Sequence, residues 1–149
     1  MIEQESEALR KGIEFEGCVR RMFEGPRFDI LVQSDEKGSK IPDFYIKEKE
    51  RGFKFWVEAK FRSTLVDESI DIFETNKDRL VVLRMFQQIV RPETVFLIIG
   101  LGAPSSNPDE LYCLPVMELD YPSRFRKALK ERRIQHSPFT RYEDGHLYQ

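Results

Sequence analysis

The stretch Lys54-Phe55-Trp56-Val57-Glu58-Ala59-Lys60-Phe61 predicts a β-strand that is apolar on one face and charged on the other. Alternate side chains of a strand point to opposite faces of its sheet. One face of this strand carries only apolar side chains, which are Phe55, Val57, Ala59 and Phe61. The opposite face carries Lys54, Trp56, Glu58 and Lys60. An ordinary core has no need for a glutamate and a lysine side by side, so this second face is the candidate functional surface.

A second strand, Asp43-Phe44-Tyr45-Ile46-Lys47-Glu48, precedes the first, and Lys49-Glu50-Arg51-Gly52 connects the two. A short polar connection that ends in glycine predicts a β-hairpin. If these residues form the whole loop, Glu48 pairs with Phe53, and Asp43 lies opposite Glu58 on the same face. Directly opposed like charges destabilise an antiparallel pair, so a positive group is expected between the two carboxylates.

The positive group beside Asp43 and Glu58 has two candidate identities. Lys60 alone cannot serve both carboxylates at once, and a divalent metal ion with oxygen ligands is the economical answer. The alternative is a half-solvated sheet face on which Glu58 and Lys60 form a surface ion pair.

A third carboxylate comes from the segment Glu5–Phe23, which contains no proline and has helical periodicity. At about 100° per residue, its apolar side chains fill one broad arc. The members of that arc are Leu9, Ile13, Phe15, Cys18, Val19, Met22 and Phe23. Glu16 falls inside the arc, where a carboxylate is costly unless it is paired or coordinates a metal ion. The alternative is a glutamate at the boundary of the core, paired with a neighbouring cation.

The bulk composition is that of one globular domain, residues 1–149. The chain is 40% hydrophobic with 12 phenylalanines, which is enough for a packed core. The longest apolar run, Val95–Leu101, is too short to cross a membrane, and the N-terminus lacks a signal-peptide pattern. Cys18 and Cys113 have no metal-like spacing and indicate reduced thiols. A cytoplasmic location is the expectation.

The charge is unevenly distributed along the chain although the net charge is only −2. Six bases and one acid occupy the segment Arg124–Arg133. A basic stretch on a near-neutral protein suits local binding of phosphates, and it is equally the pattern of a solvated helix face.

Periodicity and turn residues predict a mixed α/β order. The predicted strands are Arg27–Ser34, Asp43–Glu48, Phe53–Phe61, Thr94–Leu101 and Leu111–Val116, and the predicted helices are Glu5–Phe23, Lys77–Val90 and Ser123–Arg133, with an irregular or helical segment at Thr64–Asn76. The uninterrupted apolar residues after Thr94 favour a fully buried strand, parallel to a neighbour and reached by a helical crossover.

This order, αβββαβ with a central mixed sheet flanked by helices, resembles the PD-(D/E)xK nuclease superfamily, the restriction-endonuclease-like fold. The matching residues are Gly12-Ile13-Glu14-Phe15-Glu16, Pro42-Asp43 and Glu58-Ala59-Lys60, and the likeness covers roughly Gly12 to Gly100. The Gly-x-x-Phe-Glu sequence is similar to the archaeal junction-resolvase and Mrr-like branches. Several relatives carry a Gln-x-x-x-Tyr motif on the next helix, and the counterparts here are Val82 and Phe86. That departure speaks against the exonuclease branches.

The resemblance implies a Mg²⁺-dependent endonuclease acting on DNA, with Mn²⁺ as a substitute for Mg²⁺. Asp43, Glu58 and the Ala59 carbonyl would bind the ion, Glu16 would complete the shell or bind a second ion, and Lys60 would orient or deprotonate the attacking water. The residues expected to bind phosphates are Arg62, Arg124, Arg126 and Lys127. A homodimer would supply two symmetry-related sites for cutting two strands, although no residue identifies its interface.

Two other functions stay open at this point. The first is a catalytically silent module of the same fold that binds nucleic acid or a partner protein, which should tolerate loss of Lys60. The second is a small metal-dependent enzyme with another substrate. The chain lacks a glycine-rich phosphate loop, a Gly-x-Ser-x-Gly elbow and paired histidines, which weakens the hypothesis of an enzyme with another substrate.

Overall fold

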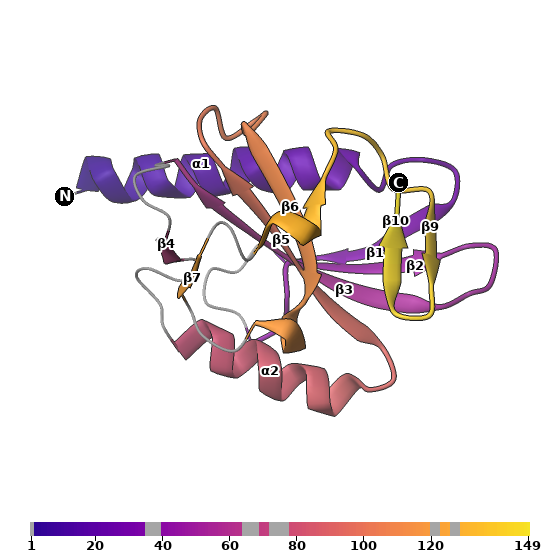
Figure 1. The fold of residues 1–149 in the computed structure, drawn as a ribbon. Helices are drawn as coiled ribbons and strands as arrows, with labels where there is room; N and C mark the ends of the chain where they lie inside the picture. The colour runs from indigo at the N-terminus through magenta and orange to yellow at the C-terminus, as the bar shows by residue number, and fades with distance from the viewer. Residues whose placement is uncertain (1, 35–39, 64–68, 72–77, 120–122, 126–128) are drawn as a thin grey trace.

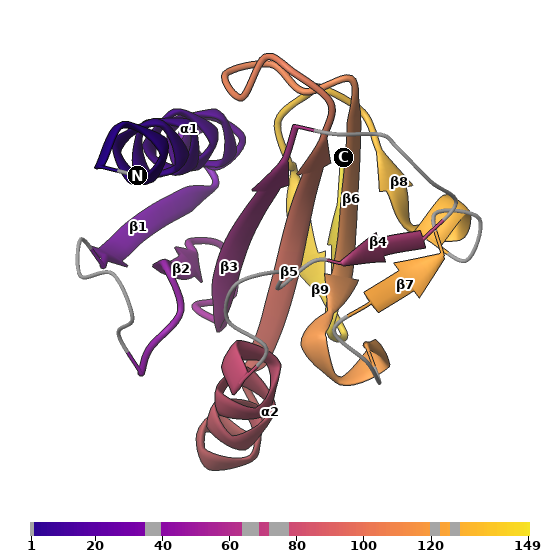
Figure 2. The ribbon, with the colours of Figure 1, turned by 90° about the vertical axis from the view of Figure 1, so that its left-hand side faces the viewer.

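The computed structural model describes residues 2–34, 40–63, 69–71, 78–119, 123–125 and 129–149. A sheet of six strands in the order β1-β2-β3-β5-β6-β8 forms its centre. The strands are β1 (Phe28–Gln33), β2 (Phe44–Glu48), β3 (Lys54–Arg62), β5 (Thr94–Leu101), β6 (Glu110–Pro115) and β8 (Arg133–Ile134). The helices α1 (Ile2–Arg21) and α2 (Asp78–Val90) lie on opposite sides of this sheet (Figure 1, Figure 2).

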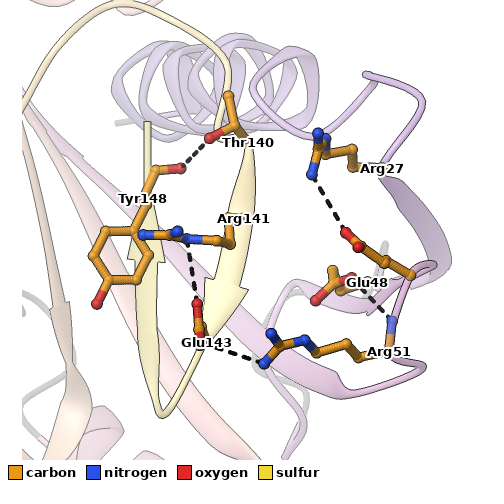
Figure 3. Close-up of polar contacts among 8 residues, drawn as sticks. Arg27, Glu48, Arg51, Thr140, Arg141, Glu143 and Tyr148 are labelled. Carbon is orange, nitrogen blue, oxygen red and sulfur yellow. Dashed lines mark hydrogen bonds and ion pairs between the residues drawn. The ribbon is translucent and has the colours of Figure 1, made fainter.

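The remaining elements are short. They are β4 (Ser69–Asp71), β7 (Ser123–Phe125), β9 (Arg141–Glu143), β10 (His146–Tyr148) and two 3₁₀ turns, η1 (Val116–Glu118) and η2 (Lys130–Arg132). β4 pairs with β7, and β9 pairs with β10 as a C-terminal hairpin. Arg51 of the β2–β3 loop lies 3.3 Å from Glu143, so the hairpin is connected by an ion pair to that loop (Figure 3).

The sheet is mixed, as predicted, because β3 and β5 run parallel and the other neighbours are antiparallel. The crossover between β3 and β5 contains α2. Every residue of β5 after Thr94 is buried. The prediction of a fully buried parallel strand at Thr94–Leu101 is therefore confirmed.

Two apolar clusters cover the two faces of the sheet. The first joins α1 to one face through residues that include Phe15, Val19, Phe55, Val57 and Phe96. The second joins α2 to the other face through Leu80, Leu83, Val95, Leu97 and Ile99, with Trp56 packed against it. Alternating residues of β3 and β5 thus enter opposite clusters, as the period of a strand requires.

Gly100 allows α1 to approach β5 closely. A Cβ atom at this position would lie 2.5 Å from Cε1 of Phe15 and 2.8 Å from Pro108. A side chain here would therefore displace the aromatic ring that fixes the part of α1 nearest the candidate site.

The structure corrects two predictions. Leu9 and Ile13 are 49% and 58% exposed, so the apolar arc of α1 is buried only from Phe15 onward. The predicted continuous helix Ser123–Arg133 is wrong at both ends, because Ser123–Phe125 form β7 and Arg133 begins β8. Between these strands Leu129 is helical, Lys130–Arg132 form the 3₁₀ turn η2, and residues 126–128 lie outside the described residues. β7 pairs with β4 and β8 pairs with β6, so tertiary pairing overrides the local helical pattern at these two ends.

The predicted segment Thr64–Asn76 lies largely outside the described residues, and its described part is β4. No helix in the described part of the chain is both long enough and apolar enough to cross a membrane.

Candidate active site

The β2–β3 hairpin places Asp43 beside Glu58. Phe44 pairs with Val57, and the Glu48 N–H donates to the Phe53 carbonyl at 2.8 Å. The predicted register is therefore confirmed, and its continuation puts Asp43 opposite Glu58. The Ala59 N–H donates to Oδ2 of Asp43 at 2.8 Å, which fixes the aspartate carboxylate against β3.

Glu58 is buried and carries a bidentate ion pair that the sequence analysis missed. Its side chain is only 2% exposed. Nε of Arg79 donates to Oε2 of Glu58 at 2.7 Å, and Nη2 of Arg79 donates to Oε1 at 3.0 Å. The same Nη2 also donates to the Ile41 carbonyl at 3.1 Å. A planar guanidinium that meets both oxygens of a carboxylate is the strongest form of a side-chain ion pair.

Arg79 reaches the site from the first turn of α2. Burial acts to lower the pKa of Arg79, but the hydrogen bonds and charge of Glu58, together with the charge of Asp43, outweigh burial and raise it. The sequence did contain a signal for this residue. Arg79 lies four positions before Leu83 and eight before Gln87, all buried, so it occupies the core-facing stripe of the helix. Like Glu16 on α1, Arg79 is a charged residue on the apolar side of its helix.

Lys60 lies on the predicted face. Its Nζ is 3.8 Å from Oε2 of Glu58, and its side chain is 27% exposed. The ammonium group is therefore beside the buried carboxylate while still in contact with solvent. This position suits a cation that meets a substrate phosphate or a water molecule.

Asp43 carries the clearest electrostatic perturbation in the site. Burial, followed by the negative charge of Glu58, raises its pKa well above the usual value. Glu16 also raises this pKa, which shows that the α1 glutamate lies within electrostatic range of Asp43. The Ala59 hydrogen bond and the charge of Lys60 act in the opposite direction. Two neighbouring carboxylates that are largely shielded from water favour binding of a proton or another cation.

The structure thus brings four predicted residues, Glu16, Asp43, Glu58 and Lys60, into one electrostatic cluster and adds Arg79. Among the described residues, no group of three His, Cys, Asp or Glu side chains is close enough to hold a metal ion by itself. The cluster therefore consists of an acidic pair, a more distant third carboxylate and two cations.

The predicted phosphate-binding residues are only partly described. Arg62 ends β3, and its Nη1 donates to the Phe61 carbonyl at 2.8 Å. Arg124 lies in β7, far along the chain from the hairpin. Arg126 and Lys127 lie outside the described residues.

The fold is the restriction-endonuclease-like α/β fold, a mixed sheet of six strands with α1 and α2 on its two sides. A solved structure that shares it is Hjc from Archaeoglobus fulgidus, a Holliday junction resolvase from an archaeal hyperthermophile. The likeness has a TM-score of 0.57 and covers 84% of this chain and 91% of that chain, at 14% sequence identity. No family model and no curated protein matches the sequence.

Proposed function

We propose that this protein is a metal-dependent nuclease that hydrolyses phosphodiester bonds in DNA as an endonuclease. The observation that carries the proposal is the position of Asp43, Glu58 and Lys60 at one end of the β2–β3 hairpin, on a fold shared with a junction resolvase. Glu16 on α1 is within electrostatic range of the same place.

The donor atoms fit Mg²⁺ better than a softer metal. Asp43 and Glu58 supply carboxylate oxygens, the Ala59 carbonyl is a further candidate ligand, and Glu16 can bind through water or hold a second ion. Mg²⁺ prefers such oxygen ligands and keeps several waters, so a site with few protein ligands suits it. The raised pKa of Asp43, due to burial and to Glu58, is the electrostatic strain that a bound dication would relieve. When bound, the ion would lower the pKa of water and neutralise charge on the attacked phosphate.

The residues of the chain have separate roles in this proposal. Lys60 is close enough to Glu58 to orient the attacking water and to stabilise the charge that develops on the phosphate. Arg79 is a positioning residue, because its guanidinium group binds both carboxylate oxygens of Glu58 and holds them in one orientation. Ala59 positions Asp43 through its backbone N–H. The DNA backbone would be bound by Arg62 and by the basic residues Arg124, Arg126 and Lys127.

One observation favours a second candidate, the catalytically silent module of the same fold. Arg79 already supplies the positive charge that the opposed carboxylates require. A site whose electrostatic demand is met by an internal arginine has less need of a metal ion. The two candidates differ in the effect of divalent ions and in the importance of Lys60.

Cleavage of a panel of DNA substrates separates these two functions. The panel consists of linear duplex, single-stranded, four-way junction and supercoiled DNA, each with Mg²⁺, with Mn²⁺ and with EDTA. The nuclease proposal expects cleavage that EDTA abolishes and that Lys60→Met reduces by at least about a hundredfold, the effect of losing one group that stabilises transition-state charge. Binding to DNA without cleavage in any metal would support the silent module. Cleavage that persists in EDTA would end the metal hypothesis.

A further inference from the structure

The sheet face that carries Glu58 continues away from the acidic pair as a row of aromatic and basic side chains. Tyr45 pairs directly with Trp56, and Lys47 pairs directly with Lys54. These four residues, called here the aromatic platform, follow Asp43 and Glu58 along the same two strands and on the same face. At about 3.3 Å per residue, Lys54 lies roughly 13 Å from Glu58 along β3.

Two aromatic rings form the centre of the platform, and their orientation is fixed. Tyr45 and Trp56 are stacked with their centroids 4.0 Å apart and an interplanar angle of 17°. The Tyr45 hydroxyl donates to Oε2 of Glu93 at 2.7 Å, and Nε1 of Trp56 donates to Oε1 of Glu93 at 3.0 Å. Phe86 of α2 contacts Trp56 edge-on. Because both polar tips are held by Glu93, the rings are preorganised.

Within the described part of the chain, the platform stays open on the side of Tyr45. Both rings are only partly buried. Val32, which lies directly opposite Tyr45 on β1, is 43% exposed. Partly open aromatic rings beside an exposed valine offer a surface on which a flat, apolar group can stack.

The lysines create an unbalanced positive charge at the end of the platform. Directly opposed like charges destabilise a sheet, and Lys47 and Lys54 form such a pair. In the described part of the chain, neither ammonium group lies within ion-pair distance of a carboxylate. Nζ of Lys54 instead lies 5.9 Å from the centre of the Tyr45 ring. The neighbouring acid Asp29, opposite Lys47 on β1, is paired with Lys49 at 3.3 Å. An anion at this place would relieve the repulsion.

Stacking surfaces interleaved with cations bind single-stranded nucleic acid. Bases stack on aromatic side chains, and phosphates contact lysine and arginine. We propose that the aromatic platform binds a single-stranded segment of nucleic acid adjoining the phosphate in the candidate active site. This inference rests on the proposed function and adds the substrate class, which is DNA with unpaired nucleotides next to the cleavage point. The negative charge of Glu93 accepts hydrogen bonds from the polar groups of Tyr45 and Trp56. The end of the platform that carries Lys47 and Lys54 therefore stays positive.

Trp56 is the only tryptophan in the chain, so intrinsic fluorescence reports on the platform directly. Titration of the full chain with an unlabelled single-stranded oligonucleotide in EDTA should quench the tryptophan emission without any cleavage. Lys47→Gln/Lys54→Gln should weaken binding about tenfold at low salt. It should also reduce the slope of log affinity against log salt by about 1.4, since each phosphate contact to a single strand contributes about 0.7.

The matched control carries the same loss of charge elsewhere. Lys11→Gln/Arg141→Gln removes one cation from α1 and one from β9, where Arg141 stacks on Tyr148 (Figure 3). Its affinity and salt slope should equal those of the unmodified chain. A second pair of variants tests stacking. Tyr45→Leu should weaken binding roughly tenfold to a hundredfold, the range for loss of one base–aromatic stack. Tyr45→Phe keeps the ring and loses only the hydrogen bond to Glu93, so it should weaken binding much less than Tyr45→Leu.

Three results would overturn the inference. The first is binding of the oligonucleotide that leaves the Trp56 emission unchanged and has the same affinity in the platform variant Lys47→Gln/Lys54→Gln and in the control variant. The second is no binding of single strands at all. The third is a change of emission with protein concentration in the absence of nucleic acid, which would identify a second copy as the occupant. Failure of the proposed function is seen separately, since a chain that never cleaves DNA can still show the quenching.

Discussion

Removal of Arg79 should destabilise the protein strongly. Arg79→Met keeps the volume of the side chain and deletes the guanidinium that contacts both oxygens of Glu58 at 2.7 and 3.0 Å. Glu58 is then a buried carboxylate with Asp43 close by, and among the described residues Lys60, at 3.8 Å, is its remaining ion-pair partner. Breaking a buried ion pair by removing one partner costs about 3–5 kcal/mol. At about 3 °C per kcal/mol, this lowers the unfolding midpoint by roughly 10–15 °C.

Thermal and urea unfolding of four chains measure this effect. They are the unmodified chain, Arg79→Met, Glu58→Leu and the double variant. The double variant should recover most of the loss, because an apolar replacement of a buried pair is close to neutral. Arg10→Met is the matched control. Arg10 forms ion pairs with Glu7 and Glu14 on the exposed face of α1, where such pairs contribute about 0–1 kcal/mol.

The role of Arg79 as an internal cation has a second consequence. Without Arg79, less positive charge offsets the repulsion between Asp43 and Glu58. Mg²⁺ should therefore raise the unfolding midpoint of Arg79→Met more than that of the unmodified chain. The reasoning is refuted if Arg79→Met costs no more than Arg10→Met, or if the double variant is as unstable as the single one.

Three further predictions concern Asp43, Glu16 and Gly100. Asp43→Asn keeps an acceptor for the Ala59 N–H and removes a charge that burial and Glu58 disfavour, so it should raise stability at pH 7 by about 1 kcal/mol while abolishing cleavage. The folded state raises the pKa of Asp43, so this acid contributes stability below its unfolded pKa of about 3.9. That stability is lost as the pH rises through the pKa of the folded state. The advantage of Asp43→Asn in the free energy of unfolding should therefore vanish at low pH. Glu16→Gln should shift the Mg²⁺ dependence of cleavage to higher concentration, and an unaltered metal titration would make it a structural residue. Gly100→Ala should cost about 1–3 kcal/mol in urea unfolding, because its Cβ would lie 2.5 Å from Phe15, and an unchanged midpoint would mean that α1 shifts freely.

Most strands of the sheet, and the acidic pair of the candidate site, could be predicted from the sequence. The register of β2 and β3 was predictable because a short loop ending in Gly52, which adopts a φ of 75°, determines which residues face each other. The bounds of β5 were predictable because its apolar run is bordered by Pro92 and by Gly102. Local chemistry determines both features, and so Asp43 and Glu58 could be placed together.

The missed features depend on contacts between distant parts of the chain. Arg79 is 21 residues from Glu58, and the packing of α2 against the sheet brings the two together. The segment after Ser123 has helical charge spacing, yet Arg124 pairs with Ile70 and Arg133 pairs with Tyr112 in strands. Leu9 and Ile13 share the period of the buried residues of α1, although they lie outside the first apolar cluster. Periodicity describes a face of a helix, and it does not say how far the partner surface extends.

Cleavage of junction and single-strand-containing DNA by a matched pair of aspartate variants tests the central claim most directly. Asp43→Asn removes one carboxylate of the opposed pair, whereas Asp144→Asn removes an exposed carboxylate from the β9–β10 turn, where a φ of 52° accepts asparagine. We expect Mg²⁺-dependent cleavage by the unmodified chain and by Asp144→Asn, and none by Asp43→Asn although it folds and binds DNA. Equal cleavage by both variants would contradict the account.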